Sequence, residues 1–170
     1  MRKTQHGFTL PELLTAMSVI AILAAIAVPT LRQFSANSRT TAANNSLVSA
    51  LAVARSEALR RSTLVTVCSS TDSQTCASSK TWSTGWIAFT DLNANGALDG
   101  TDVLLQAWSA PADNVSVSST AKFLTYDARG MAMLAPATFN TWVPGCRGTN
   151  QTQVVVTIGG SPQNTHIACP

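Results

Sequence analysis

The stretch Gly7-Phe8-Thr9-Leu10-Pro11-Glu12 opens an apolar run that continues to Pro29. No Asp, Glu, Lys or Arg occurs from Leu13 to Leu31. Nineteen uncharged residues, at about 1.5 Å rise each, nearly span the hydrocarbon core of a bilayer as a helix. The short segment before this run is polar and carries Arg2 and Lys3, which favours a cytoplasmic position for the N-terminal side. We therefore expect a segment that inserts into a membrane.

Three interpretations of this segment compete. A secretory signal peptide would be cut after Ala25-Ile26-Ala27, but its apolar region would be too long and would carry Glu12 at its start. A plain membrane anchor explains the length but not Gly7-Phe8 or Glu12. In the third interpretation the chain is cut between Gly7 and Phe8, ahead of the apolar run, so that the run is retained. This third interpretation accounts for all of the features.

The pattern resembles the type IV pilin and type II secretion pseudopilin superfamily. Gly7, Phe8 and Glu12 match its motif, and Pro29 lies where members often carry a helix-bending proline. Pro11 departs from the commoner aliphatic residue, but in the first helical turn its missing N–H costs little. The resemblance implies that a prepilin peptidase cuts at Gly7–Phe8, that the new amine is methylated, and that this amine pairs with Glu12. The alternative for Glu12 is solvation among lipid headgroups.

The rest of the chain has the composition of an exported domain. Of the 170 residues only 11% are charged, and the part beyond Leu31 is rich in Ser, Thr, Asn and Gln. That part holds nine basic and seven acidic residues, and a net charge of +2 is too small to indicate nucleic-acid binding by itself. We expect four segments: a leader (1–7), a transmembrane assembly helix (8–31), the second half of the same helix (32–61) and a globular β domain (62–170).

The pattern beyond the membrane predicts an α+β fold. Apolar residues recur at helical spacing from Asn37 to Arg61, so one helix is expected from about Thr9 to Arg61, with Glu57 in reach of Arg61. After Ser62 the sequence favours strands. We expect the helix to pack on an antiparallel sheet, as in pilins. The expected strands are Leu64–Cys68, Trp86–Phe89, Val103–Trp108, Val115–Val117, Phe123–Tyr126 and Val154–Ile158.

Four cysteines lie outside the apolar run. An even number in an exported domain favours two disulfides, for which the sequence permits three connectivities. We favour Cys68–Cys76 and Cys146–Cys169, because each closes a short loop. Zinc binding is disfavoured, because no CxxC pair is present and the only histidines are His6 and His166.

The segment from Asp91 to Asp102 is compatible with a calcium-binding loop. Carboxylate and amide oxygens alternate along it, and Gly96 occupies the position of the sharp turn. Against this, Asp102 replaces the usual bidentate Glu, and the flanks are strand-like. The alternative is a long hairpin turn rich in Asp, Asn and Gly. The candidate ligands are Asp91, Asn93, Asn95, Asp99 and Asp102, and no other cofactor is expected.

The globular part resembles the GspH/FimT-type minor pilins and pseudopilins. The similar features are the segment Ala54–Ala58, the strand into Cys68, Trp82 with Gly85–Phe89, and the late Cys146 and Cys169. The resemblance implies a low-abundance subunit of a priming or tip complex that starts pilus assembly in the bacterial inner membrane. Its partners would be other minor pilins, the major pilin and the prepilin peptidase. A type II secretion pseudopilin is the alternative.

Two further functions find little support in the sequence. His166 has no carboxylate neighbour in sequence and no G-x-S-x-G context occurs, so an enzyme is not expected. Some FimT-type members bind DNA through a C-terminal Gly-Arg-x-Arg motif. The corresponding stretch here, Gly159-Gly160-Ser161-Pro162-Gln163, lacks both arginines, and only Arg147 remains in the C-terminal region. A DNA-uptake receptor is therefore disfavoured.

Overall fold

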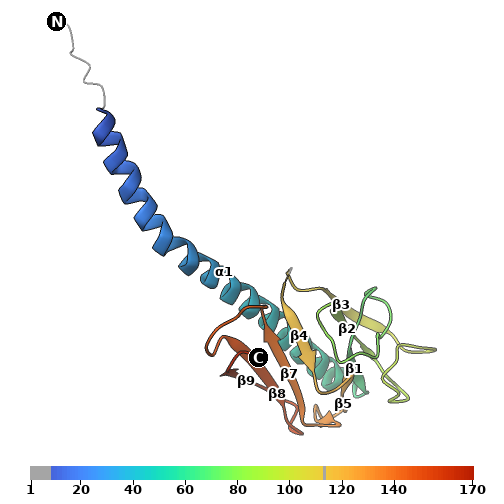
Figure 1. Ribbon diagram of the computed structural model, residues 1–170. Coiled ribbons are helices and arrows are strands. Elements are labelled where there is room, and N and C mark those ends of the chain that lie inside the picture. Colours follow the sequence, from blue (N-terminus) through green and yellow to red (C-terminus); the bar gives the residue numbers. More distant parts are fainter. Residues whose placement is uncertain (1–8, 113) are drawn as a thin grey trace, which may run out of the picture. The chain divides into compact units, whose positions relative to one another are not determined.

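A single helix, α1 (Leu10–Arg61), dominates the N-terminal third of the chain. The computed structural model describes residues 9–112 and 114–170, and the chain divides into two units, Met1–Ser35 and Ala36–Pro170. The helix starts one residue after Thr9, as the sequence predicts, and continues without interruption past Pro29. In Figure 1, α1 is coloured from blue to teal, and the strands follow it along the chain from green to red.

In the first unit, the helical residues from Leu10 to Ser35 are all exposed. Large apolar side chains project from every side of this part of α1, which is typical of a helix surrounded by lipid or by other apolar helices. The helix is long and apolar enough to cross a membrane. Its exposed apolar surface indicates that other molecules or lipid must cover it.

In the second unit, α1 is amphipathic and supplies one side of the hydrophobic core. Small and aliphatic residues on one face are buried, while Arg39, Ser49 and Arg60 point to solvent. Alanine at close-contact positions lets the helix backbone approach the strands. The buried apolar helix residues are Ala43, Leu47, Ala50, Leu51, Ala54 and Ala58.

The strands form two antiparallel sheets rather than the one sheet that the sequence predicts. The first sheet has the order β3-β2-β1-β5-β6, and its central strands are buried on both faces. One face packs on α1, and the other covers a small cluster around Cys68, Ile87 and Phe89. Its strands are β1 (Val65–Ser69), β2 (Gly85–Thr90), β3 (Leu104–Ser109), β5 (Phe123–Tyr126) and β6 (Ala132–Met133).

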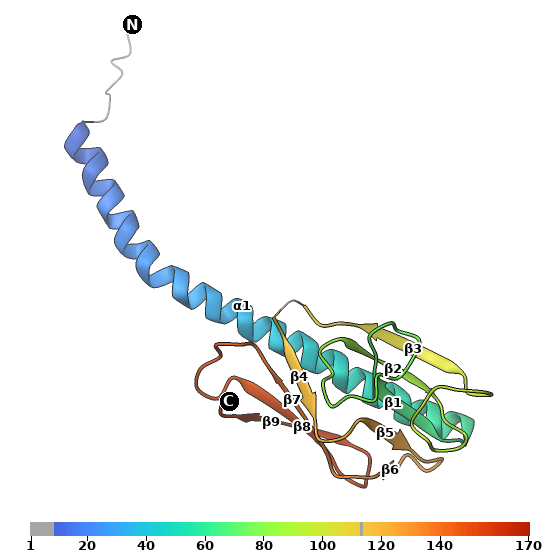
Figure 2. The ribbon, with the colours of Figure 1, turned by 45° about the vertical axis from the view of Figure 1, so that its right-hand side comes forward.

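The second sheet has the order β4-β7-β8-β9. Its inner face joins the core of α1 and the first sheet through Val117, Phe139, Val154 and Val156. Figure 2 shows the two sheets on neighbouring sides of the C-terminal half of α1. Its strands are β4 (Ser116–Ser119), β7 (Ala137–Trp142), β8 (Gln151–Val156) and β9 (Pro162–Ile167).

The six expected strands are present with small shifts, and three strands are additional. The last expected strand, Val154–Ile158, is β8 ending at Val156, because Ile158 lies in the following turn. The short strand β6 and the polar strand β9 have little apolar content, so no pattern indicated them. Strand β7 alternates buried and half-buried residues, a period-two signal in the sequence that our prediction missed.

Candidate functional site

The start of α1 shows one half of a capping box, in which the Glu12 carboxylate reaches back to Thr9. Thr9 precedes the helix, and Glu12 lies three residues later, the spacing at which a carboxylate reaches back to the N-cap. The Oε2 atom of Glu12 lies 3.5 Å from the Thr9 backbone nitrogen and 3.4 Å from its hydroxyl oxygen. Glu12 therefore has a local role in starting the helix. The expected cleavage and methylation residues, Gly7 and Phe8, lie outside the described residues, so the pairing of Glu12 with the Phe8 amine stays a prediction.

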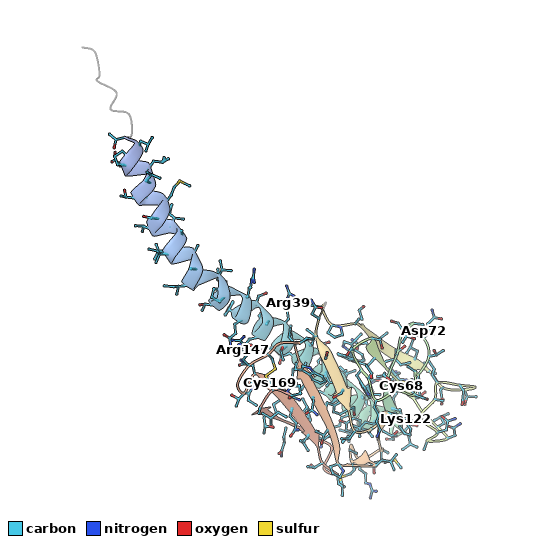
Figure 3. The ribbon with its side chains drawn as sticks, viewed as in Figure 1. Arg39, Cys68, Asp72, Lys122, Arg147 and Cys169 are labelled. Atoms are coloured by element: carbon cyan, nitrogen blue, oxygen red, sulfur yellow. A yellow bond between two sulfur atoms is a disulfide. The ribbon has the colours of Figure 1, made fainter. Side chains whose placement is uncertain are left out.

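Two disulfides brace the globular unit. Cys68 on β1 is bonded to Cys76, and Cys146 is bonded to Cys169, the pairing that we favoured from the loop lengths. The first holds the loop after β1 against the outer face of the first sheet, where Cys68 is fully buried. The second ties the C-terminus to the loop before β8, near Arg147 (Figure 3).

The Asp91–Asp102 loop is held by its own carboxylates. Asp91 is fully buried, and its oxygens accept hydrogen bonds from the Thr66 hydroxyl at 2.7 Å and from the backbone N–H groups of Asn95 and Gly96 at 3.1 and 3.0 Å. Asp102 accepts from the Leu92 N–H at 3.1 Å. These bonds make the segment a hydrogen-bonded turn between β2 and β3.

The observed hydrogen bonds favour the hairpin-turn alternative, and the calcium ligand set stays a prediction. Carboxylate oxygens that must converge on a cation instead face N–H and O–H donors, and the Asn95 side-chain amide donates to Asp99 at 2.7 Å. Within residues 9–112 and 114–170, no group of three or more His, Cys, Asp or Glu side chains is placed to hold a metal ion. The loop therefore matches the alternative of a hairpin turn stabilised by Asx side chains.

We expect no heat of binding when millimolar calcium is titrated into the purified protein. The Asp91 carboxylate already accepts three hydrogen bonds, and a cation would have to compete with them. Asp91→Ala should nevertheless lower the unfolding temperature, because the Thr66 hydroxyl and two N–H groups lose their acceptor. Isothermal calorimetry and thermal unfolding measure the two effects. A calcium-dependent rise in the unfolding temperature that Asp91→Ala removes would restore the calcium hypothesis.

The Arg55 side chain joins α1 to two turns that are distant in sequence. Its Nε donates to the Gly130 carbonyl oxygen at 3.0 Å, and its two terminal nitrogens donate to the Ser161 hydroxyl at 2.8 Å and the Gly159 carbonyl oxygen at 3.0 Å. The planar guanidinium suits such a forked contact. We call this set of residues the Arg55 junction; it connects the helix to the β5–β6 turn and the β8–β9 turn.

Two glycines make the Arg55 junction sterically possible. Gly130 and Gly160 both have positive φ, +74° and +77°, which L-residues other than Gly adopt at a cost. A Cβ at Gly160 would overlap the Gly130 carbonyl oxygen, and one at Gly130 would crowd the Arg55 Nε and Leu59.

The β8–β9 turn is the stretch that lacks the arginines of a DNA-binding motif. The structure brings a guanidinium to this turn from the helix, but three of its five N–H donors are engaged within the protein.

No pattern in the sequence indicated the Arg55 junction. Arg55 is half-buried. Its partners are carbonyl and hydroxyl oxygens, and a sequence carries no charge pattern that reveals such partners. The buried Tyr126 lies beside the junction, and burial raises the pKa of its hydroxyl. The available signal in the sequence was the pair of glycines Gly130 and Gly160, 30 residues apart, because glycine readily adopts a positive φ.

Arg55→Ala is expected to destabilise the globular unit by about 1.5 to 3 kcal/mol, the range for hydrogen bonds of a charged group. Arg55→Lys should recover little of this loss, because one ammonium cannot satisfy three acceptors on two turns. Denaturant unfolding of the three proteins provides the comparison. If the lysine variant is as stable as the original, charge rather than the forked geometry matters at this position.

Glu57 is paired with two arginines near the end of α1. Its Oε2 atom lies 2.6 Å from nitrogen atoms of both Arg60 and Arg61, so the predicted Glu57–Arg61 pair is confirmed. Hydrogen bonds from Arg60 and then Arg61 lower the Glu57 pKa to about 2 from its ordinary value of 4.5. The pair is at the surface, so its contribution to stability is small.

The protein should lose stability as the pH falls from about 4.5 to about 2. A carboxyl whose pKa is lowered by folding stabilises the folded state fully above its unfolded pKa, and this stabilisation is lost as it protonates. Hydrogen bonds also lower the pKa values of Asp72 and Asp127, mainly from the N–H groups of Gln74 and Met131. Unfolding temperatures of the original protein and Glu57→Gln should therefore differ at pH 7 and converge near pH 2. A constant difference across this range would contradict the assignment.

The remaining candidates for chemistry are structural. The segment Asp127–Gly130 is a turn in which the Asp127 carboxylate accepts from the N–H groups of Arg129 and Met131. Trp82 and Trp86 are in the core. His166 lies exposed on the edge strand β9.

A long apolar helix joined to a disulfide-braced, two-sheet domain is the architecture of pilin-like subunits. The chain belongs to the family described as type II transport protein GspH, whose model matches residues 43–161. A model of the prokaryotic N-terminal methylation motif matches residues 2–28. No curated protein matches the sequence.

Solved structures with a similar fold include those of a minor pilin and of a minor pseudopilin. The crystal structure of the type IV minor pilin FimU of Pseudomonas aeruginosa (strain PAO1) is 19% identical, covers 76% of this chain and 87% of its own, and gives a TM-score of 0.58. The minor pseudopilin EpsH from the type 2 secretion system of Vibrio cholerae is 11% identical, covers 76% and 97%, and gives a TM-score of 0.50.

These findings define the protein at a coarse level. It is a structural, non-enzymatic subunit of the minor pilin or pseudopilin class, belonging to a type IV pilus or a type II secretion system. Its methylation motif implies processing by a prepilin peptidase, and its family implies association with other pilins. The hydrophobic helix and the motif are consistent with an inner-membrane pilin that is assembled into a pilus.

Proposed function

We propose that the protein is a minor type IV pilin that takes part in a tip-located priming complex and so helps to initiate pilus assembly. The observation that carries this proposal is the two-sheet domain, whose fold is more similar to the minor pilin FimU than to the pseudopilin EpsH. The exposed apolar half of α1 supplies a surface for the filament core. Before assembly, α1 anchors the chain in the inner membrane and the globular domain lies in the periplasm. After assembly, the subunit is at the cell surface.

Deletion of the gene tests this proposal directly. The expected result is a loss of surface pili with normal export of secreted enzymes, and the full-length protein should co-purify with other minor pilins and the major pilin. Complementation with the intact gene should restore the pili. Normal piliation in the deletion strain would overturn the proposal.

The alternative is a type II secretion pseudopilin, which the description of the matched family favours. In that case the deletion strain keeps its pili and retains exoenzymes in the periplasm. DNA-receptor activity is a weaker alternative, because the β8–β9 turn carries no arginine of its own. A gel shift with the purified protein should show no retarded DNA at physiological salt.

A further inference from the structure

Arginines follow directly after the apolar half of α1. The uncharged run ends at Leu31, Arg32 is the next residue, and Arg39 comes eight residues after Leu31, or about 12 Å along the helix. Both arginines are exposed. In membrane proteins, Lys and Arg are concentrated in the cytoplasmic segments. Two arginines on the exported side of a membrane helix are therefore unusual, and they indicate a partner of opposite charge.

The end of the second unit at which α1 enters also carries the loop between β7 and β8. Arg55 comes sixteen residues after Arg39, about 24 Å farther along α1, and it donates to the β8–β9 turn. The end of β8 is therefore beside the far part of the helix, and the start of β8, about 17 Å back along the strand, lies toward Arg39. Figures 1 and 2 both show the loop before β8 next to the first turns of α1 in this unit.

This loop supplies a third arginine. Arg147 is exposed, and Figure 3 labels it at the same end of the unit as Arg39. The disulfide from Cys146 to Cys169 and the hydrogen bond from the Cys169 N–H to the Gly148 carbonyl oxygen, at 2.9 Å, hold the backbone on both sides of it. The loop that presents Arg147 is thus braced. We use the name basic collar for Arg32, Arg39 and Arg147.

The basic collar carries positive charge that the described part of the chain does not neutralise. None of its arginines forms a salt bridge with a described residue. In the sequence, α1 has no Asp or Glu between Glu12 and Glu57, and none occurs after Asp127. Even if Asp113, which lies outside the described residues, faced the collar, three arginines against one carboxylate would leave a net charge of +2.

Aromatic side chains accompany the basic collar. Phe34, which is 72% exposed, lies between the two arginines of α1 in the sequence. Trp142 is the last residue of β7, is half-buried, and comes five residues before Arg147. Tryptophan is enriched at the level of the lipid headgroups, because its ring is apolar and its N–H is a donor. Arginines beside aromatic side chains are thus suited to a membrane interface.

We propose that the basic collar binds the headgroups of anionic phospholipids in the leaflet that faces the globular unit. Ala36, where the second unit starts, is five residues after Leu31, or about 8 Å along the helix, which keeps this end of the unit near the headgroup region. A guanidinium group binds phosphate through two parallel N–H bonds. The proposal requires only membrane insertion, holds for a pilus or a secretion subunit alike, and so goes beyond the proposed function.

Spin-labelled lipids test this contact. The full-length protein is reconstituted in phosphatidylcholine vesicles with a trace of spin-labelled phosphatidylglycerol or phosphatidylcholine, and electron spin resonance gives the fraction of each lipid that the protein immobilises. The original protein should prefer phosphatidylglycerol, and raising the salt concentration should lower this preference. An arginine near an anionic surface contributes roughly fivefold in affinity. Changing all three collar arginines to Gln should therefore lower the preference at least roughly threefold.

Single variants make the test specific. Arg147→Gln alone should lower the preference, because the proposal brings this loop to the same headgroups as α1. Arg129→Gln is the matched control and should leave the preference unchanged, since Arg129 has an 85% exposed side chain on the turn that Arg55 binds. The leader residues Arg2 and Lys3 are present in every variant, so they do not affect the comparison.

Four results would overturn the proposal: an equal preference in the original protein and the triple variant, no effect of Arg147→Gln, an equal loss in Arg129→Gln, or a preference that salt does not lower. If the triple variant keeps the lipid preference but no longer co-purifies with other pilins, the collar binds an acidic protein surface instead of lipid. The assay needs no pilus, so its failure leaves the piliation test of the proposed function unaffected.

Discussion

Glu12→Ala is expected to lower incorporation of the protein into filaments roughly tenfold or more while leaving its amount in the membrane unchanged. A charged group costs several kcal/mol to bury in apolar surroundings unless it is paired, and about 1.4 kcal/mol already corresponds to a factor of ten. In the predicted pairing, removing the carboxylate leaves the amine that cleavage at Gly7–Phe8 would create without a partner as the subunit enters the filament core. Immunoblots of sheared filaments and of membrane fractions measure the two quantities.

Glu12→Gln separates the two roles that Glu12 can have. Its Oε2 atom faces the Thr9 N–H and hydroxyl, and an amide oxygen accepts these bonds equally well in a capping box. If Glu12 acts through its charge, the glutamine variant should fail as the alanine variant does. If capping alone matters, the glutamine variant should assemble normally. Normal assembly of both variants would show that neither role is needed.

Trp82→Ala is expected to destabilise the globular unit by about 3 to 5 kcal/mol, the usual range for loss of a large buried aromatic side chain. Trp82 is fully buried, lies outside the strands, and belongs to the core that α1 and both sheets share. Its ring contacts Phe139 of β7 edge-to-face at a centroid distance of 4.9 Å. Its indole N–H donates to the Ala121 carbonyl oxygen at 3.3 Å.

Trp82→Phe is the matched control. It keeps an aromatic ring in the core and loses the indole N–H, so we expect a loss of about 1 to 2 kcal/mol. Thermal unfolding followed by tryptophan fluorescence or circular dichroism compares the three proteins. Equal stability of Trp82→Ala and the original protein would mean that the two sheets are held together without this side chain.

Much of the fold was predictable because its signals are local. Helix α1 follows from the uncharged run and from the apolar spacing after Asn37, and strands such as β2 and β5 follow from runs of aromatic and β-branched residues. Strand β9 could not be predicted, since its residues are polar and its position depends on pairing with β8. The loop before β3 was ambiguous, because alternating Asp and Asn residues suit a cation or a turn equally well.

The sequence by itself determined the class of subunit: a short basic leader, Gly7-Phe8, Glu12 and an uncharged helix are contiguous, and a membrane and a peptidase recognise contiguous segments. Only the tertiary structure decided the rest. It divided the strands into two sheets, turned the Asp91 carboxylate inward to hold its own loop, and brought Arg55 to turns centred on Gly130 and Gly160. The physical reason is that hydrogen bonds and packing between residues 75 to 106 positions apart depend on the whole core, which no local pattern encodes.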